Sequence, residues 1–351
     1  MRDIMQDVSS WREENKEVVV ATVVKAYGSA LRPIGSKMAI SSAGDISGSV
    51  SGGCVESAVY EAAQAVFESG QAKLVSYGIA DETAWSVGLT CGGTIEVFLE
   101  LLDGRGENSS YEILTHALQT DTLIGQATVL TGAHAGEHLL LWPDGSFKGD
   151  VGEKKFLVHI QAAAEDLFRQ QETRKLEIET GDEQAAVFIQ VYPPSPRLIV
   201  VGAVHIAVPL VALGNTMGFR TVVVDARSAF ATRERFPHVD ELVVKWPAEA
   251  LESLHLDEGS YVAILSHDAK FDIPALQVAV QSRARYVGVL ASKHTYQVLY
   301  QALREEGVSE ELLEKVHTPI GIKKLGAQGP EGIAFSIMAE MIAEMKGVKV
   351  S

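Results

Sequence analysis

Apolar and polar positions follow two different periods along the first hundred residues. "VVVATVV" (18–24) is an apolar run rich in β-branched residues, and "AISSAGDISGSV" (39–50) has the pattern of a strand, a glycine turn and a strand. Residues 55–70 place apolar side chains at helical spacing and end in Gly70, a residue typical of helix C-termini. "TIEVFLELL" (94–102) predicts a further strand, so the predicted order is β-β-α-β.

The same order returns about a hundred residues later. "MAISSAGDISGSV" (38–50) aligns with "LLLWPDGSFKGDV" (139–151) at an offset of 101, and "EVFLELL" (96–102) corresponds to "AVFIQVY" (186–192). We predict a duplicated β-β-α-β unit, over about 18–102 and 126–192, in a domain that spans 1–192. The offset of 101 also aligns the apolar positions of the two helices: Val55, Val59, Ala62, Ala63, Val66 and Phe67 with Phe156, Ile160, Ala163, Ala164, Leu167 and Phe168.

The first copy differs from the second in three segments. It is longer at "KAYGSALRPIGSK" (25–37) and at "ADETAWSVGLTCGG" (80–93), and it has "SGGC" (51–54) where the second copy has "GEKK". A fold that forms without these segments does not need them for its core. They hold both cysteines of the chain, Cys54 and Cys91, each beside a Gly-Gly pair. We therefore predict a functional role for the cysteines, although a small buried apolar side chain is the commoner fate of a free cysteine.

The second half has the pattern of a dinucleotide-binding fold. "PPSPR" (193–197) predicts a linker, because its prolines stand between two strand-like runs. Residues 198–227 then read as strand, glycine turn, helix, strand and acidic residue, which is the order of a first Rossmann unit. We predict a doubly wound, mainly parallel sheet over 198–351. Further strands are predicted at 241–244, 261–267 and 285–290, and helices near 272–283, 293–306 and 330–346.

The dinucleotide fingerprint of this half is incomplete. Its three small positions are Gly202, Val204 and Ala207, and Asp225 lies where a ribose-binding carboxylate is expected. Val204 puts a β-branched side chain where a second glycine normally lets the pyrophosphate approach the backbone. The sequence therefore makes NAD(P) binding doubtful and leaves open a Rossmann scaffold that binds no dinucleotide.

Two polar stretches at predicted strand ends have alternative interpretations. His205 begins the first helix of this half and could cap it or face a ligand. "SHD" (266–268) and Asp272 follow a later strand, at the edge of an open α/β sheet where ligands bind. They could equally form a helix N-cap and a polar turn.

Composition excludes several classes of protein. With 46% apolar and 22% charged residues among 351, the chain resembles a globular protein, and its net charge of −16 argues against nucleic-acid or anionic-membrane partners. The sequence shows no apolar run of about 20 residues and no signal-peptide pattern. Two cysteines make no disulfide framework, which favours the cytoplasm, and they are too few for iron–sulfur clusters. The sequence shows no zinc-type ligand spacing either.

Together these motifs resemble the xanthine dehydrogenase accessory protein family, XdhC/CoxI. The resemblance implies a chaperone that binds the molybdenum cofactor (molybdopterin), assists its sulfuration by a cysteine desulfurase, and delivers it to xanthine dehydrogenase or a related molybdenum hydroxylase. It favours an accessory factor, linked to purine catabolism, over a catalyst. Val204 and Ala291 depart from the family pattern. The motifs that carry the resemblance are GSALRPIGSKM (28–38), GSVSGGCVE (48–56), AWSVGLTCGG (84–93), GAVHIA (202–207), VVDAR (223–227), SHD (266–268), YVGVLASK (286–293), TPIG (318–321) and PEGIAFSIMAE (330–340).

The cysteine segments suit such a cofactor. A glycine-rich turn at a helix N-terminus offers free N–H groups and a positive dipole end to an anionic group. The same dipole end favours the thiolate of Cys54, which could ligate molybdenum or relay sulfur as a persulfide. Arg32 or Lys37 could meet the phosphate of the cofactor, or could simply belong to a solvated loop. We expect Cys54 and Cys91 in one cleft, with cofactor-binding residues Ser51, Gly52, Gly53, Thr90, Gly92, Gly93 and Arg32, and no other metal site.

A second hypothesis places function in the other domain. It is an NAD(P)-dependent oxidoreductase, or a xanthine dehydrogenase-associated subunit, that binds its cofactor through Gly202, His205 and Asp225. The two hypotheses differ in where small-molecule affinity lies, since the chaperone depends on Cys54 and Cys91. A homodimer is compatible with both.

Overall fold

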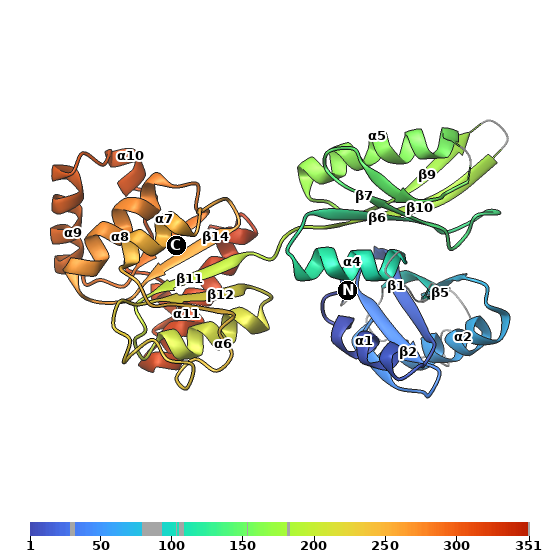
Figure 1. Cartoon of the computed structure of the whole chain (residues 1–351), viewed down its shortest axis with the longest axis horizontal. Helices are drawn as coiled ribbons and strands as arrows, with labels where there is room; N and C mark the ends of the chain where they lie inside the picture. The colour runs from blue at the N-terminus through green and yellow to red at the C-terminus, as the bar shows by residue number, and fades with distance from the viewer. Residues whose placement is uncertain are drawn as a thin grey trace. The chain divides into compact units, whose positions relative to one another are not determined.

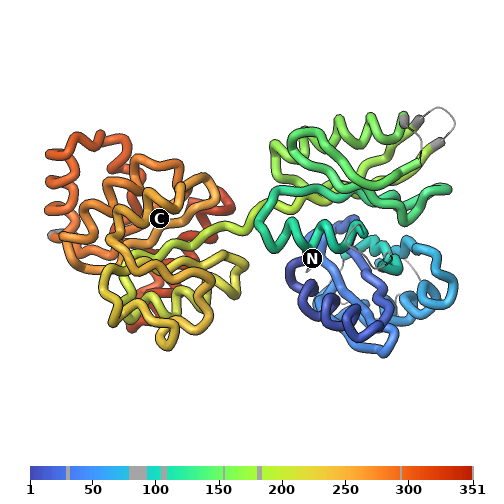
Figure 2. The backbone as a smooth tube through the Cα atoms, in the orientation of Figure 1, coloured from blue at the N-terminus to red at the C-terminus, as the bar shows by residue number. Residues whose placement is uncertain are grey.

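The protein consists of two compact units, Met1–Pro194 and Ser195–Ser351, which divide within the predicted linker (Figures 1 and 2). The computed structural model describes residues 1–28, 32–78, 93–102, 104, 109–152, 154–180 and 183–349.

The first half of the N-terminal unit forms a five-stranded antiparallel sheet, here sheet A. Its strand order is β3-β2-β1-β5-β4, so β1 lies in the middle. The apolar faces of β1, β2 and β5 pack against α2. The elements are α1 (Met5–Glu13), β1 (Val18–Tyr27), β2 (Lys37–Ser41), β3 (Ile46–Gly48), α2 (Glu56–Ser69), β4 (Lys73–Tyr77) and β5 (Thr94–Leu101).

The second half of this unit repeats the arrangement in sheet B. Its strand order, β8-β7-β6-β10-β9, is that of sheet A, which confirms the predicted duplication. The register agrees as well, because Ala21 pairs with Met38 as Ala127 pairs with Leu139. The elements are α4 (Ser110–Gln119), which precedes the sheet, β6 (Ile124–Val129), β7 (His138–Leu141), β8 (Phe147–Gly149), α5 (Lys154–Gln170), β9 (Arg174–Thr180) and β10 (Glu183–Tyr192).

One glycine serves the same purpose in both copies. Gly48 and Gly149 end β3 and β8 with positive φ angles of 76° and 120°. A Cβ atom would lie 2.3 Å from the carbonyl oxygen of Lys37 in the first copy and 2.2 Å from that of His138 in the second. Only glycine allows this close approach of the strands, so its recurrence follows from the shared backbone geometry.

Each copy also has an edge strand that the sequence prediction lacked. β4 and β9 pair with β5 and β10 at the sheet edges. The sequence "KLVSY" of β4 is short, and its side chains are partly or fully exposed. A strand that buries so little apolar surface gives a weak pattern, which is why the order β-β-α-β was incomplete.

The two sheets stack on each other through the faces that point away from α2 and α5 (Figure 1). Val24 and Phe98 of sheet A contact Leu130, Ala186 and Phe188 of sheet B in one buried cluster. Helix α4 fills the space between the sheets on one side and contributes to two further clusters.

The C-terminal unit is a Rossmann-like domain, as predicted. Its parallel sheet has the order β13-β12-β11-β14-β15, and the direction of winding reverses between β11 and β14. Helices α7 to α10 cover one face, and α6 and α11 cover the other. The elements are β11 (Arg197–Val201), α6 (Ala207–Thr216), β12 (Arg220–Val224), β13 (Glu241–Val243), α7 (Pro247–Ser253), β14 (Ser260–Ile264), α8 (Ala269–Gln281), β15 (Tyr286–Val289), α9 (Lys293–Glu305), α10 (Glu310–Leu313), the 3₁₀ turn η1 (Lys323–Leu325) and α11 (Gly329–Met345).

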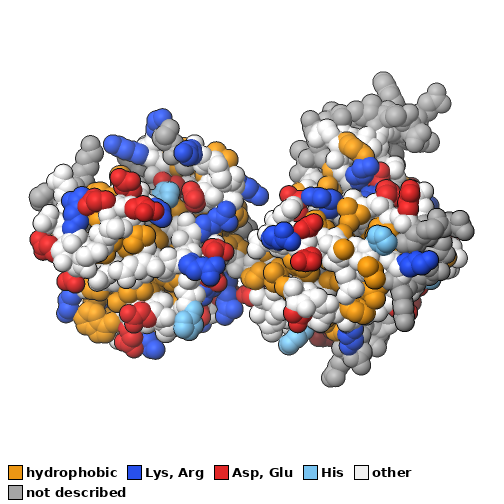
Figure 3. Space-filling model, turned by 90° about the horizontal axis from the view of Figure 1, so that it is seen from above, with side chains coloured by type: hydrophobic (Ala, Val, Ile, Leu, Met, Phe, Trp, Pro, Cys, Tyr) orange, Lys and Arg blue, Asp and Glu red, His pale blue; other side chains and the backbone are white. Residues whose placement is uncertain are grey.

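The surface carries charges of both signs. Figure 3 shows one face, on which acidic and basic side chains lie among hydrophobic ones. In the part of the chain that the structure describes, we find no helix with the length and apolar character needed to span a membrane.

Candidate functional site

The three segments that distinguish the first copy attach to one end of sheet A. At this end β1, β3 and β4 finish, while β2 and β5 begin. The segments between β1 and β2, between β3 and α2, and between β4 and β5 therefore leave the sheet side by side. The strand pairs that establish this are Thr22 with Lys37, Met38 with Gly48, Tyr27 with Thr94, and Tyr77 with Ile95.

The loop between β3 and α2 is organised by the side chain of Glu56. Its Oε1 accepts hydrogen bonds from the backbone N–H groups of Ser51 (2.9 Å) and Gly52 (3.0 Å), and its Oε2 accepts one from that of Gly53 (2.8 Å). The hydroxyls of Ser49 and Ser51 donate to the same carboxylate at 2.6 and 2.5 Å. Burial alone would raise the pKa of Glu56, but these hydrogen bonds outweigh it and lower the pKa to about 2.

This arrangement corrects the prediction that the loop offers free N–H groups to an anion. The N–H groups of residues 51–53 point at Glu56, and those of Cys54 and Val55 donate to the hydroxyl of Ser51, both at 3.0 Å. The carboxylate of the chain itself takes the position that a bound anion was expected to take. Gly52 and Gly53 have positive φ angles of 85° and 114°, so the loop needs their backbone freedom.

Cys54 is half-buried at the beginning of α2. It packs against the edge of the cluster between α2 and sheet A, and Tyr77 of β4 packs against the same cluster. The hydroxyl of Tyr77 is buried and has no hydrogen-bond partner among the described residues, and burial raises the pKa of this group to about 12. A sulfur atom and a phenol therefore both border this end of sheet A.

The two candidate cations have different positions. Arg32 lies at the loop, where its Nε donates to the carbonyl oxygen of Ser49 at 3.2 Å and its Nη2 lies 3.5 Å from the carboxylate of Asp3. Lys37 is buried on the opposite face of the sheet and donates to the hydroxyl of Thr22 at 2.8 Å. Lys37 thus faces sheet B, and the prediction that it could meet a phosphate beside Cys54 was wrong.

The other cysteine segment is not described at its centre. Thr90, Cys91 and Gly92 lie outside the described residues, so the single cleft with Cys54 stays a prediction. Gly93 is buried directly before β5, at the end of sheet A to which the other two segments attach. Among the described residues no group of three or more His, Cys, Asp and Glu side chains could hold a metal ion.

These residues fit the molybdenum cofactor only in part. The thiol of Cys54 is a soft ligand suited to molybdenum, and the partly exposed guanidinium of Arg32 suits a phosphate. The loop N–H groups do not contribute, because they already donate to Glu56 or to the hydroxyl of Ser51.

In the Rossmann domain the predicted ribose carboxylate is fully engaged. Asp225 is buried, and its Oδ2 accepts the N–H of Ala203 in the glycine turn at 2.7 Å. The guanidinium of Arg227 donates to both oxygens of Asp225, at 2.9 and 2.8 Å. Burial would raise the pKa of Asp225, but the hydrogen bonds from Arg227 and Ala203 lower it. Both carboxylate oxygens of Asp225 therefore already accept hydrogen bonds from within the domain.

Other residues around the glycine turn also argue against dinucleotide binding there. Arg235 donates to the carbonyl oxygen of Ala203 at 2.8 Å, and Val204 packs against the domain core. A Cβ atom on Gly202 would lie 2.8 Å from Ser266, so a glycine here allows the close contact between the segments that follow β11 and β14. His205 is exposed.

The motif SHD follows β14 as expected. Asp268 caps α8 by accepting the N–H of Lys270, and Ser266 donates to the buried Asp272 at 2.6 Å. The N-cap and polar-turn interpretation of this motif is therefore confirmed.

Comparison with known proteins agrees with the motifs in both units. The model of the XdhC and CoxI family matches residues 11–78, and the model of the XdhC Rossmann domain matches residues 198–341. The chain belongs to the XdhC and CoxI family. The match to the XdhC and CoxI model includes the segment with Cys54 and Glu56.

Relatives of this XdhC-type chain align over nearly its whole length. It is 29% identical to a protein of Bacillus subtilis whose name describes a probable xanthine dehydrogenase subunit, over 96% of each chain. It is 26% identical to the "Molybdenum cofactor insertion chaperone PaoD" of Escherichia coli, over 93% of this chain and 83% of PaoD. A crystal structure from Bacillus halodurans, titled as a xanthine dehydrogenase, has a TM-score of 0.80 and 26% identity, and the alignment covers 98% and 96% of the two chains.

Glu56 is the residue of this site that sequence reasoning missed. It is the first residue of α2, and an acidic residue in the first turn is a sequence signal of a helix N-terminus. Tyr77 was missed too, since it belongs to the unpredicted strand β4.

Proposed function

We propose that this protein is a maturation factor that binds the molybdenum cofactor and delivers it to xanthine dehydrogenase or a related molybdenum hydroxylase. The observation that supports the proposal most is the attachment of three segments, absent from the second copy, to one end of sheet A. Two of these segments contain the cysteines. A duplicated scaffold that adds thiols at a single end is adapted there for binding rather than for stability.

In this proposal Cys54 contacts the cofactor directly. Glu56 holds the loop in one conformation. The backbone around the thiol therefore loses little conformational entropy when the cofactor binds. Arg32 borders the loop and would pair with the phosphate of the pterin. Cys54 either ligates molybdenum or carries transferred sulfur as a persulfide that a cysteine desulfurase supplies. Cys91 would face Cys54 across the same cleft.

The family relationships support the choice of partner. Relatives that align over most of the chain are named as a molybdenum cofactor insertion chaperone and as a probable xanthine dehydrogenase subunit. We infer that the protein acts in the cytoplasm and contacts both the hydroxylase and the desulfurase, and a homodimer is compatible with this role. An oxidoreductase based on the Rossmann domain is not favoured, because Asp225 is bound by Arg227 and Ala203.

The test is cofactor retention by Cys54→Ser in the full-length protein. Serine is nearly isosteric with cysteine, so we expect a stability change under about 1 kcal/mol and a sharp loss of bound pterin or of its sulfuration. The measurements are fluorescence of the oxidised pterin per protein, sulfuration of the bound cofactor, and thermal unfolding.

Ser57→Ala is the matched control: Ser57 is exposed in the first turn of α2, so this variant should bind cofactor as the wild type does. Equal pterin retention and equal sulfuration in Cys54→Ser and wild type would refute the proposal. A large drop in melting temperature would instead indicate a structural role for this cysteine.

A further inference from the structure

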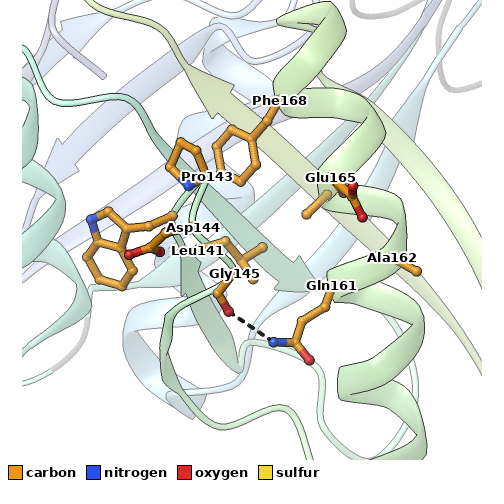
Figure 4. A pocket seen from close by; sticks show the side chains of 10 residues that line it. Leu141, Pro143, Asp144, Gly145, Gln161, Ala162, Glu165 and Phe168 are labelled. Carbon is orange, nitrogen blue, oxygen red and sulfur yellow. Dashed lines mark hydrogen bonds between the residues drawn. The ribbon is translucent and has the colours of Figure 1, made fainter.

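The second copy contains a pocket of about 480 Å³ on the outer side of sheet B. It lies between the turn that joins β7 to β8, which contributes Pro143 and Gly145, and helix α5, which contributes Gln161 and Phe168. Figure 4 shows Phe168 beside Pro143 at one end of the pocket and Gln161 bonded to Gly145 at the other. Its volume is that of an ordinary small-ligand site.

The corresponding place in the first copy is filled. The offset of 101 aligns Gly44 with Gly145 and Tyr60 with Gln161. A Cβ atom on Gly44 would meet the hydroxyl of Tyr60 at 3.2 Å, whereas one on Gly145 would meet nothing within 4 Å. The shorter Gln161 donates to the carbonyl oxygen of Gly145 at 3.3 Å. Gln161 thus leaves open the space beside Gly145 that corresponds to the space beside Gly44 reached by the hydroxyl of Tyr60.

The polar groups of the pocket are acidic. Asp144 and Glu165 belong to its lining, and none of the described residues that line it is lysine or arginine. Hydrogen bonds from Ser146 lower the pKa of Asp144, so this carboxylate is charged at neutral pH. The side chain of Glu165 is 80% exposed and lies 3.9 Å from Arg169, which is closer to Asp166 at 3.1 Å.

We infer that this pocket binds a guanidinium or ammonium group carried on an apolar stem, such as an arginine side chain of a partner polypeptide. Phe168, Pro143 and Leu141 offer apolar surface to the stem, and Asp144 and Glu165 attract the cationic head. An anion would be repelled, and a wholly apolar ligand would remove water from the carboxylates without replacing its hydrogen bonds. This inference does not depend on the proposed function.

Titration calorimetry of the full-length protein tests the inference with three probes. They are a capped Gly-Arg-Gly peptide, the same peptide with glutamine in place of arginine, and agmatine, which is a free guanidinium on an alkyl stem. We expect the arginine peptide to bind and the glutamine peptide to bind at least tenfold more weakly. If agmatine binds as well as the arginine peptide, the ligand that carries the guanidinium group is a small organic cation rather than a polypeptide.

Two sets of variants locate the binding. Gln161→Tyr introduces the residue of the first copy and should close the pocket and abolish binding, while Tyr60→Gln in the first copy should leave binding unchanged. The combined exchange Asp144→Asn and Glu165→Gln removes the charge at nearly constant shape and should weaken binding at least tenfold. Equal binding of the two peptides, undiminished binding by the charge variant, or no binding of either guanidinium probe would overturn the inference.

Discussion

At the scale of single residues, Glu56 determines the conformation of the loop that presents Cys54. Six hydrogen bonds from five neighbouring residues end on one carboxylate: four from backbone N–H groups and two from serine hydroxyls. A glutamine can accept through only one oxygen, and its amide group would oppose some of the N–H donors. The charge is therefore as important here as the shape of the side chain.

We predict that Glu56→Gln lowers the free energy of unfolding by about 1–3 kcal/mol, because it leaves partly buried donors without acceptors. Glu61→Gln, on the exposed side of the same helix, should change it by less than about 0.5 kcal/mol. Denaturant unfolding at pH 7 is the measurement. Equal stability of the two variants would show that Glu56 does not hold the loop.

The same carboxylate predicts a pH dependence. The pKa of Glu56 is about 2 in the folded protein, below the usual value near 4.5. The unfolded chain therefore binds a proton first as the pH falls, and the stabilisation by Glu56 is complete above pH 4.5 and lost toward pH 2. Over this window the stability of the wild type should fall more steeply than that of Glu56→Gln.

Residue roles were less predictable from the sequence than residue positions. The motif around Cys54 predicts a candidate site, but it does not predict that Glu56 accepts hydrogen bonds from the N–H groups there. The spacing from Gly202 located Asp225 correctly at the end of β12, yet Arg227, only two residues further on, engages its carboxylate. Such pairings depend on which way side chains turn at a strand end, and a one-dimensional pattern does not contain that information.

At the scale of elements, strongly periodic segments were predictable and weakly amphipathic ones were not. Helices α2 and α5 each bury a continuous apolar stripe, so their spacing was visible in the sequence. β4 and β9 lie at sheet edges. They contain few apolar residues among polar ones, so their pattern in the sequence is weak. The parallel strands of the Rossmann domain are buried between helices on both faces, so they were the easiest elements to predict from the sequence.

The glycine turn between β11 and α6 provides a prediction about this domain. Val204→Gly would remove the side chain that departs from the dinucleotide fingerprint. We nevertheless expect no measurable NAD binding to this variant, since Asp225 and Arg235 still bind the backbone of Ala203.

Titration calorimetry with NAD on wild type and Val204→Gly measures this directly. Melting temperature with and without NAD provides an independent readout, because a ligand that binds only the folded state raises it. Tight binding by either protein would contradict the prediction and revive the oxidoreductase hypothesis.

At the scale of the whole N-terminal unit, the two copies meet through equivalent faces that have diverged in charge. Lys37 and His138 occupy equivalent positions at the starts of β2 and β7, and each contacts the threonine opposite it, Thr22 or Thr128. The Nε2 atom of His138 also lies 2.9 Å from a carboxylate oxygen of Glu100 in the first copy. Duplication thus placed ionisable groups inside a sheet-to-sheet interface that also contains an apolar cluster.

Because Lys37 is buried, its effect on the free energy of unfolding depends on pH. Burial lowers the pKa of Lys37 to about 8, and the nearby Glu100 offsets this only in part. Below pH 8 both states are protonated and the folded state bears the full desolvation cost. Between pH 8 and about 10.5 the unfolded chain keeps a proton that the folded protein has released, so stability rises with pH.

We predict that Lys37→Met is more stable than wild type at pH 7 by about 1 kcal/mol or more, since each unit of pKa shift corresponds to about 1.4 kcal/mol. Glu100 keeps His138 as its partner in this variant. The difference should shrink as the pH rises from 8 to 10.5, because the wild type then loses the buried charge. Lys73→Met, an exposed position in the same sheet, should follow the wild type at every pH. Denaturant unfolding across this range measures the differences, and a Lys37→Met advantage that is absent or independent of pH would mean that burial does not destabilise the charged form of Lys37.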